Sequence, residues 1–189
     1  MADGLLLIDK PSGITSHDIV GKIRRFYGTR QVGHAGTLDP LATGLLLVLV
    51  GSATKASEYA MEHTKQYEAV LRLGMITDTE DITGQILHES PVTNTSEDVF
   101  TVVSSFLGDS LQTPPMYSAL KVQGQKLVDL ARKGIAIDRE SRPIHISQIT
   151  PKQISNTDYS LDVSCSKGTY IRTLCQDIGE KLGCGGGMG

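Results

Sequence analysis

The sequence predicts an α+β fold with a mixed, mainly antiparallel central sheet that is flanked by helices. Two observations favour this class. Segments with the two-residue period of strands and segments with the helical period follow one another without the strict alternation of a parallel α/β protein. The chain of 189 residues is long enough for one sizeable core, and it shows no internal repeat and no linker that would separate two large domains.

The chain is predicted to begin with a strand and a helix. Leu5–Ile8 is a short apolar run that ends at a proline- and glycine-containing turn, which is typical of a buried strand. Thr15 and Ser16 are good helix-capping residues, and apolar side chains recur after them at helical spacing. Gly28 then supplies a stop signal for the helix.

A glycine-rich segment comes next. Residues 32–43 contain glycines and a proline, so we predict an irregular loop that leads into a buried strand at residues 44–50. A helix over residues 53–62 is expected to follow, with Ser52 or Thr54 as its cap.

The remaining elements are predicted from the same signals. Residues 65–76 alternate between apolar and polar side chains, as in a half-buried strand. The other elements expected are a polar turn at 77–84, a short strand at 85–88, a helix capped by Ser96 and ending at Gly108, an extended segment at 112–117, a short basic helix at 126–133, paired strands at 142–154 and 159–165, and a last helix at 171–182. The glycine-rich tail, residues 183–189, is not expected to form a helix or a strand.

The composition is that of an ordinary globular protein, with 39% hydrophobic and 21% charged residues. No apolar run approaches the length of a membrane span, and the first residues do not form a secretory signal. Cys165, Cys175 and Cys184 are odd in number and form no C-x-x-C pair, which argues against a disulfide scaffold or a zinc site. We therefore expect a cytoplasmic protein with reduced thiols.

The distribution of charge is more informative than the formal net charge of -3. Lys and Arg are in excess in residues 10–30 and 121–142, whereas residues 78–109 contain acidic side chains and no Lys or Arg. Two basic regions separated by an acidic one are compatible with a basic face opposite an acidic face. Composition alone leaves the alternative open that these charges are solvated and have no partner.

One carboxylate in the glycine-rich loop, Asp39, directly precedes Pro40. The proline ring moves Asp39 away from helical dihedral angles, and Gly33 and Gly36 leave room for a backbone or a ligand to approach. Such a carboxylate is a candidate catalytic group. It is also compatible with a tight surface turn in which Asp39 bonds to its own backbone, and local chemistry alone favours this second interpretation.

Six segments of the chain resemble, in order, the motifs of the TruB-type tRNA pseudouridine-55 synthases. These segments are residues 9–16, 33–44, 65–69, 77–81, 113–121 and 166–172. Each motif is weak alone, but the ordered set is specific and spans nearly the whole chain. The resemblance implies a pseudouridine synthase-like fold and the isomerisation of one uridine in the tRNA T-loop, at position 55, without a cofactor or a metal.

The resemblance assigns the catalytic aspartate to Asp39, and it implies that Arg172 is the guanidinium that keeps this carboxylate ionised. Arg172 lies near the start of the last helix, where the helix dipole disfavours a cation, so a compensating acidic partner is expected. The resemblance gives Arg172 the same pairing with Asp39 and adds Asp81 as a further carboxylate of the network. Tyr67 matches the active-site aromatic residue. Two alternatives remain open, namely that Tyr67 is a plain core residue and that Asp81 only stabilises a turn.

The resemblance also implies residues that bind the RNA. His34 resembles the residue beside the flipped-out nucleotides, Lys10 is expected to brace the active-site loop, and Tyr170 is expected to pack against the target base. The second basic region corresponds to an RNA-clasping insertion at about residues 112–142, whose cations would contact phosphates. The full set of substrate- or RNA-binding candidates is Lys10, His34, Asp81, Lys121, Lys126, Arg132 and Tyr170.

The resemblance also defines a domain organisation. Residues 1–184 correspond to the catalytic domain, and the glycine-rich residues 185–189 stand where family members continue into an arginine-rich strand and a small RNA-binding domain. We expect this C-terminal domain to be absent here. The expected partner is the T-arm or elbow of tRNA, bound by a monomer without metal or membrane. A module that binds or folds the tRNA elbow with little catalysis is the alternative function.

Overall fold

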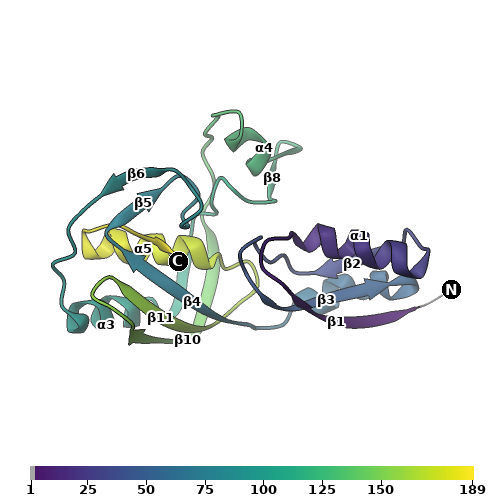
Figure 1. Cartoon of the computed structure of the whole chain (residues 1–189), viewed down its shortest axis with the longest axis horizontal. Helices are drawn as coiled ribbons and strands as arrows, with labels where there is room; N and C mark the ends of the chain where they lie inside the picture. The colour runs from purple at the N-terminus through teal and green to yellow at the C-terminus, as the bar shows by residue number, and fades with distance from the viewer. Residues whose placement is uncertain (1–2) are drawn as a thin grey trace. The chain divides into compact units, whose positions relative to one another are not determined.

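The computed structural model describes residues 3–189. They form two compact units, of which the first ends at His63 and the second runs from Thr64 to Gly189 (Figure 1). Each unit combines an antiparallel sheet with helices, which confirms the predicted α+β class. No Pro-, Gly- or Ser-rich linker stands at residues 63–64, so this division was not predicted.

The first unit is built on a three-stranded antiparallel sheet in the order β1–β3–β2. Its elements are β1 (Gly4–Lys10), α1 (Ser16–Tyr27), β2 (Val32–Ala35), β3 (Gly44–Val50), the 3-10 helix η1 (Gly51–Ala56) and α2 (Ser57–Met61). Its buried core comes from α1 and the sheet, and consists of Ile19, Val20, Val32, Leu46, Val48 and Val50.

Helix α1 has the boundaries that its sequence signals predict. The Thr15 side chain accepts a hydrogen bond from the Asp18 N–H (3.1 Å), and the Asp18 carboxylate accepts one from the Thr15 N–H (2.8 Å). This capping box satisfies two backbone donors that the first helical turn cannot satisfy itself. Gly28 ends the helix in the left-handed conformation, with φ of 62°.

Two predictions for this unit were wrong. The segment predicted to be an irregular loop begins as a strand, because Val32–Ala35 pairs with Val50–Leu47 of β3. The helix predicted at residues 53–62 is instead the 3-10 turn η1 followed by the short helix α2. Thr54 does not cap it, because the Thr54 hydroxyl donates to the Gly51 carbonyl (2.7 Å).

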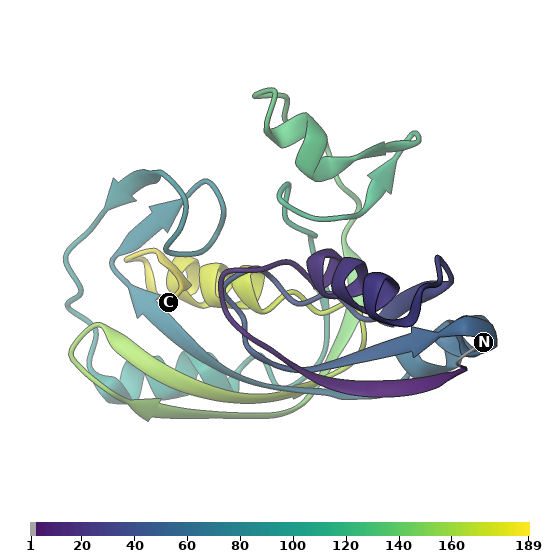
Figure 2. The ribbon, with the colours of Figure 1, turned by 45° about the vertical axis from the view of Figure 1, so that its right-hand side comes forward.

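The second unit is built on a five-stranded antiparallel sheet in the order β12–β4–β11–β10–β7. Its elements are β4 (Lys65–Leu73), β5 (Met75–Thr77), β6 (Ile86–Glu89), α3 (Ser96–Ser104), β7 (Gly108–Gln112), β8 (Lys121–Val122), β9 (Gln125–Lys126), α4 (Leu127–Ala131), β10 (Arg142–Gln153), β11 (Asp158–Cys165), α5 (Ile171–Leu182) and β12 (Gly186–Met188). Helices α3 and α5 contribute to one core with alternate residues of β4, β10 and β11. In both views α5 (yellow) lies between this sheet and the β5–β6 hairpin (Figure 1, Figure 2).

Some elements of this unit differ from the prediction. Thr95, not Ser96, caps α3, and the helix ends at Ser104, so Gly108 begins a new strand instead of ending the helix. This strand, β7, and the short β8–β9 hairpin were not predicted. Strand β7 forms by pairing with β10, which is distant in the chain, and β8 pairs with the adjacent β9. Neither has a periodicity of its own that would have predicted it.

The glycine-rich tail forms a strand, which corrects the prediction that it could not. Gly186–Met188 (β12) pairs with Leu73–Leu71 of β4 and therefore covers the edge of that strand. A Cβ atom on Gly186 would lie 2.9 Å from the Cys175 carbonyl oxygen and 3.0 Å from the Gly179 Cα. The absence of side chains is therefore what lets β12 approach helix α5 so closely.

Candidate active site

In the first unit, Lys10 ties the Asp39 loop to the turn after β1. Its side chain is fully buried, and Nζ donates to the carbonyls of Pro11 (2.9 Å), Ile14 (2.9 Å) and Pro40 (3.2 Å). Burial lowers the pKa of Lys10, and the negative charge of Asp39 opposes this shift. These contacts fit a bracing role for Lys10, because an ammonium with three carbonyl partners is committed to the protein itself.

The backbone on the other side of Asp39 is also fixed. The Ser16 hydroxyl, in the first turn of α1, accepts a hydrogen bond from the Leu38 N–H (3.0 Å) and donates to the Leu38 carbonyl (3.1 Å). The Leu38 side chain packs against the core of the unit. After Asp39, its carbonyl accepts from the Ala42 N–H (3.1 Å) and closes a turn. Asp39 is thus presented from a loop that is held at the residues before and after it.

His34 lies on β2, ahead of this loop, and is half-buried. Its Nδ1 atom is within hydrogen-bond distance of the Gly36 carbonyl oxygen, so the backbone orients the imidazole ring. Gly36 has φ of 95°, a conformation that favours glycine. The first unit therefore contains the candidates Lys10, His34 and Asp39.

In the second unit, Arg172 is held at the start of α5 and is only 5% exposed. Its guanidinium donates from Nη1 to the Thr79 carbonyl (2.8 Å) and from Nη2 to the Tyr117 carbonyl (2.9 Å). The Arg172 Nε atom lies 3.9 Å from Asp81 Oδ2, which is an ion pair longer than a hydrogen bond. An acidic neighbour is therefore present where the helix dipole makes one favourable.

Asp81 is 7% exposed and has two roles in the loop at residues 77–84. Its Oδ1 atom accepts hydrogen bonds from the Thr83 N–H (2.9 Å) and from the hydroxyls of Thr79 and Thr83. These bonds stabilise the turn, whereas Oδ2 faces Arg172. The two interpretations of Asp81 left open by the sequence are thus compatible with one side chain.

Tyr170 directly precedes α5, and its backbone is held by a residue that sequence reasoning did not single out. Gln112, at the end of β7, is 3% exposed. Its side chain accepts from the Tyr170 N–H (2.8 Å) and donates to the Tyr170 carbonyl (3.0 Å). The only sequence signal for this contact was a polar residue at the end of a strand, which is too common to identify it.

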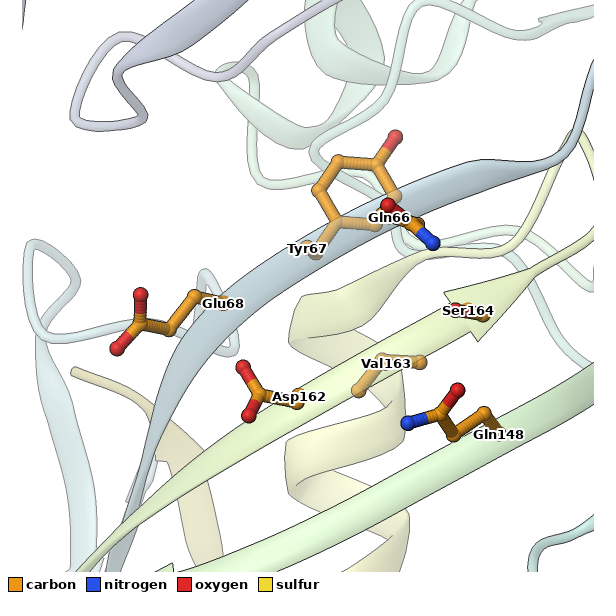
Figure 3. A pocket seen from close by; sticks show the side chains of 7 residues that line it. All are labelled: Gln66, Tyr67, Glu68, Gln148, Asp162, Val163 and Ser164. Carbon is orange, nitrogen blue, oxygen red and sulfur yellow. The ribbon is translucent and has the colours of Figure 1, made fainter.

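Tyr67 lies on β4 and packs against the core of the second unit. It also borders a cavity of about 330 Å³ whose other lining residues are Gln66, Glu68, Gln148, Asp162, Val163 and Ser164 (Figure 3). The close-up shows Gln66 and Glu68 as neighbours of Tyr67 on the same strand. Because Arg172 and Asp81 do not line this cavity, we do not assign the reaction to it.

The basic candidates of the second unit lie on the insertion between β7 and β10. Lys121 and Lys126 pair across the β8–β9 hairpin, and Arg132 follows α4. All three are exposed. In both views this insertion stands away from the five-stranded sheet (Figure 1, Figure 2). The second unit therefore contains Tyr67, Asp81, Tyr170, Arg172 and these three cations.

Two further findings concern the described part of the chain, residues 3–189. No group of three or more His, Cys, Asp or Glu side chains in it is placed to hold a metal ion. Among the same residues, every helix is too short or too polar to cross a membrane. Cys165, Cys175 and Cys184 are free and buried, as expected for reduced thiols.

Comparison with solved structures defines the class of the fold. The chain matches one titled "Crystal Structure of a Cbf5-Nop10-Gar1 Complex" with a TM-score of 0.74 and 28% identity, over 98% of this chain and 46% of the other. A second match is titled "Structure of H/ACA RNP bound to a substrate RNA containing 2'-deoxyuridine", with a TM-score of 0.70, 26% identity, and coverage of 98% and 45%. The fold is that of the pseudouridine synthases.

The family follows from the sequence matches. Residues 24–171 match the family model described as TruB family pseudouridylate synthase (N terminal domain), and the chain belongs to this family. A relative named tRNA pseudouridine synthase B from Salmonella paratyphi B is 49% identical over 182 residues, which are 96% of this chain and 58% of the relative. Its namesake from Escherichia coli O1:K1 / APEC is 48% identical over 183 residues, covering 97% and 58%. The chain thus spans about three-fifths of the length of these relatives.

Proposed function

We propose that this chain isomerises uridine 55 in the T-loop of tRNA to pseudouridine, with Asp39 as its catalytic carboxylate. The observation that carries the proposal is the fixed Asp39 loop, held through Lys10 and Ser16, in a chain of the TruB family. Two relatives that are 48% and 49% identical are named tRNA pseudouridine synthase B. A structural neighbour is titled as bound to a substrate RNA, which also supports an RNA substrate.

The reaction breaks the N-glycosidic bond, turns the uracil while it is held, and joins the sugar C1′ to the uracil C5. Asp39 acts on the ribose, either as a nucleophile at C1′ or as the base that removes the C2′ proton, and both routes need an ionised carboxylate. We assign catalytic roles to Arg172 and Tyr67 as well. The buried Arg172 guanidinium is a fixed positive charge of the kind that favours an ionised carboxylate.

The base must leave its stack before it can react, and this costs a few kcal/mol. We propose that His34 and Tyr170 act beside the extruded nucleotide. The exposed cations Lys121, Lys126 and Arg132 would contact phosphates, giving affinity that falls as salt rises. Because tRNA is the proposed substrate, we place the reaction in the cytoplasm and propose that the chain acts as a monomer without a cofactor or a metal.

The deciding experiment incubates the chain with unmodified tRNA and maps pseudouridine chemically. We expect wild-type protein to modify the T-loop uridine and Asp39→Asn to leave no product above background. Asp109→Asn, at a 92% exposed carboxylate, is the matched control and is expected to retain wild-type activity. Equal absence of product in wild type and Asp39→Asn would refute catalysis by this chain.

The same preparations test the alternative function of a tRNA-binding module. That function predicts tRNA binding without product, unaffected by Asp39→Asn. Binding that weakens with salt is expected under either function, and replacing Lys121, Lys126 and Arg132 together by Ala should reduce the slope of log affinity against log salt by roughly two to three. No detectable tRNA binding at low salt would exclude both functions.

A further inference from the structure

The loop at residues 77–84 is held between helix α5 and the C-terminal strand. On one side, the Thr79 carbonyl accepts from Arg172 Nη1. On the other side, the Met188 N–H donates to the Glu80 carbonyl (2.9 Å), and the Met188 carbonyl accepts from the Ile82 N–H (2.9 Å). The loop backbone at residues 79–82 therefore has partners on both sides.

Glu80 occupies an unusual backbone conformation in this loop. Its φ is +65°, in the left-handed region that residues with a side chain adopt rarely. A residue held in such a conformation needs a surrounding structure that compensates for its energetic cost. The fixed carbonyl of Glu80 is one part of that compensation, and the contact of its side chain is the other.

The Glu80 carboxylate reaches α5 beside Arg172. Its Oε2 atom accepts a hydrogen bond from the Thr173 hydroxyl at 2.5 Å. Thr173 is 4% exposed and follows Arg172 in the first turn of the helix. Since a hydrogen bond to a charged acceptor is among the stronger ones, this contact restrains the helical turn that carries the guanidinium.

The charges around Glu80 connect it to Arg172 more directly. Burial raises the pKa of Glu80, while the Thr173 hydrogen bond and the positive charges of Arg172 and Arg139 oppose that rise. Asp177, one helical turn beyond Thr173, adds a negative charge that raises the Glu80 pKa further. Arg172 thus interacts with two acidic side chains of the loop, Asp81 and Glu80.

We infer that Glu80 is a positioning residue for Arg172, acting through its hydrogen bond to Thr173 and through its negative charge. The inference rests on the proposed function only in that Arg172 is assigned there to catalysis. Glu80 itself contacts the helix and the loop, so its effect on the reaction is exerted through the placement of the guanidinium.

The first test observes Arg172 without RNA. The Nε–Hε signal of Arg172 is recorded by NMR in protein labelled with ¹⁵N-arginine, and it is assigned by its loss in Arg172→Lys. Asp177 also titrates and acts on Glu80, so the titration is made in an Asp177→Asn background. We expect the signal to move in a step whose midpoint is above the ordinary glutamate pKa.

Matched variants identify the origin of that step. Glu80→Gln keeps the size of the side chain but removes its charge, so the step is expected to vanish, whereas Glu89→Gln, at an exposed glutamate of β6, should retain it. Thr173→Val removes the donor and should shift the step, while Thr173→Ser keeps the hydroxyl and should preserve it. An unchanged step in Glu80→Gln would overturn the inference.

The second test measures the pH profile of pseudouridine formation. Near pH 8, Glu80→Gln is expected to lower kcat about five-fold with KM unchanged, because tRNA contacts are not affected. As the pH falls through the raised Glu80 pKa, wild type takes up a proton there and the two rates should converge. Two parallel profiles would contradict a role for the Glu80 charge.

The two tests separate this inference from the proposed function. If wild type makes no pseudouridine but the Arg172 signal follows Glu80, the proposed function fails and the positioning role stands. If wild type is active but its Arg172 signal ignores Glu80, the positioning role fails and the proposed function stands.

Discussion

Gly179 offers the sharpest test of how the C-terminal strand is held. It lies in helix α5, where it faces β12, and a Cβ atom added to it would lie 2.1 Å from the Gly186 nitrogen and 2.3 Å from the Gly185 carbonyl carbon. Both are backbone atoms, so no side-chain rotation can relieve the contact. We therefore predict that Gly179→Ala displaces β12 from the helix.

Two opposing effects determine how much Gly179→Ala changes the free energy of unfolding. Alanine in a helix interior is favoured over glycine by about 1 kcal/mol. Against this, overpacking typically costs about 1–3 kcal/mol, and a displaced β12 also loses hydrogen bonds to Glu80 and Ile82 that are each worth about 1 kcal/mol. The clash and the lost bonds outweigh the helix propensity, so we expect a net destabilisation of about 2–4 kcal/mol.

Gly21 is the matched control, because it lies within helix α1 and a Cβ atom there would meet nothing within 4 Å. Gly21→Ala is expected to stabilise its unit by up to about 1 kcal/mol through helix propensity. Both variants are measured by urea unfolding, with hydrogen exchange followed separately in the two units. For Gly179→Ala, exchange at residues 186–188 should also accelerate.

Equal stability changes in Gly179→Ala and Gly21→Ala would contradict a clash between α5 and β12. A Gly179→Ala protein that unfolds at the same urea concentration as wild type, with unchanged exchange at residues 186–188, would show that β12 does not depend on the close approach to α5.

Two further predictions concern buried groups of the second unit. Burial, and then the charge of Glu180, raise the pKa of Asp177 from 3.8 to about 6, so wild type loses stability as the pH rises through this interval. This difference in pKa corresponds to at most about 3 kcal/mol of stability. Because solvent screens this half-buried carboxyl, we expect Asp177→Asn to stabilise the protein by about 1 kcal/mol at pH 8 and not at pH 4. Equal effects at both pH values in urea titrations would contradict this expectation. The Tyr159 hydroxyl is buried and has no hydrogen-bond partner among the described residues, so Tyr159→Phe should raise the free energy of unfolding by about 1 kcal/mol. A loss of stability in the same titration would reveal a partner for the hydroxyl.

The elements that the sequence predicted well have strong local signals. Helix α1 has its capping box at Thr15 and its glycine stop at Gly28, both within the segment itself. The β10–β11 pair was predicted too, and its second strand shows the alternation of apolar side chains at Tyr159, Leu161, Val163 and Cys165. For such elements the neighbours along the chain already specify the backbone conformation.

The elements that were missed depend on distant partners. Gly186–Met188 carries no strand pattern, and it becomes a strand because β4 offers hydrogen bonds and Gly179 leaves space against α5. Val32–Ala35 is a comparable case, since its glycine-containing sequence predicts a loop and its pairing with β3 makes it a strand. Tertiary contacts override local preference at both places.

The residues of the candidate site also fall into those with a signal in the sequence and those that depend on distant partners. Asp39, Asp81 and Arg172 were predicted as site residues from ordered motifs, but Glu80 and Gln112 were not singled out. Glu80 meets Thr173 across 93 residues and Gln112 meets Tyr170 across 58 residues, so no local pattern links the partners. Residues that support a site through such contacts become visible only once the chain is folded.

The partners of Arg172 explain how a buried guanidinium can be held and remain a cation. Nη1 donates to the Thr79 carbonyl and Nη2 to the Tyr117 carbonyl, and these two acceptors carry no formal charge. Asp81 stands at 3.9 Å instead of forming a bidentate pair, and its Oδ1 is occupied by Thr79 and Thr83. These carbonyl contacts fix the position of the guanidinium at the start of α5, and a fixed position is what a positive charge that stabilises an anion requires.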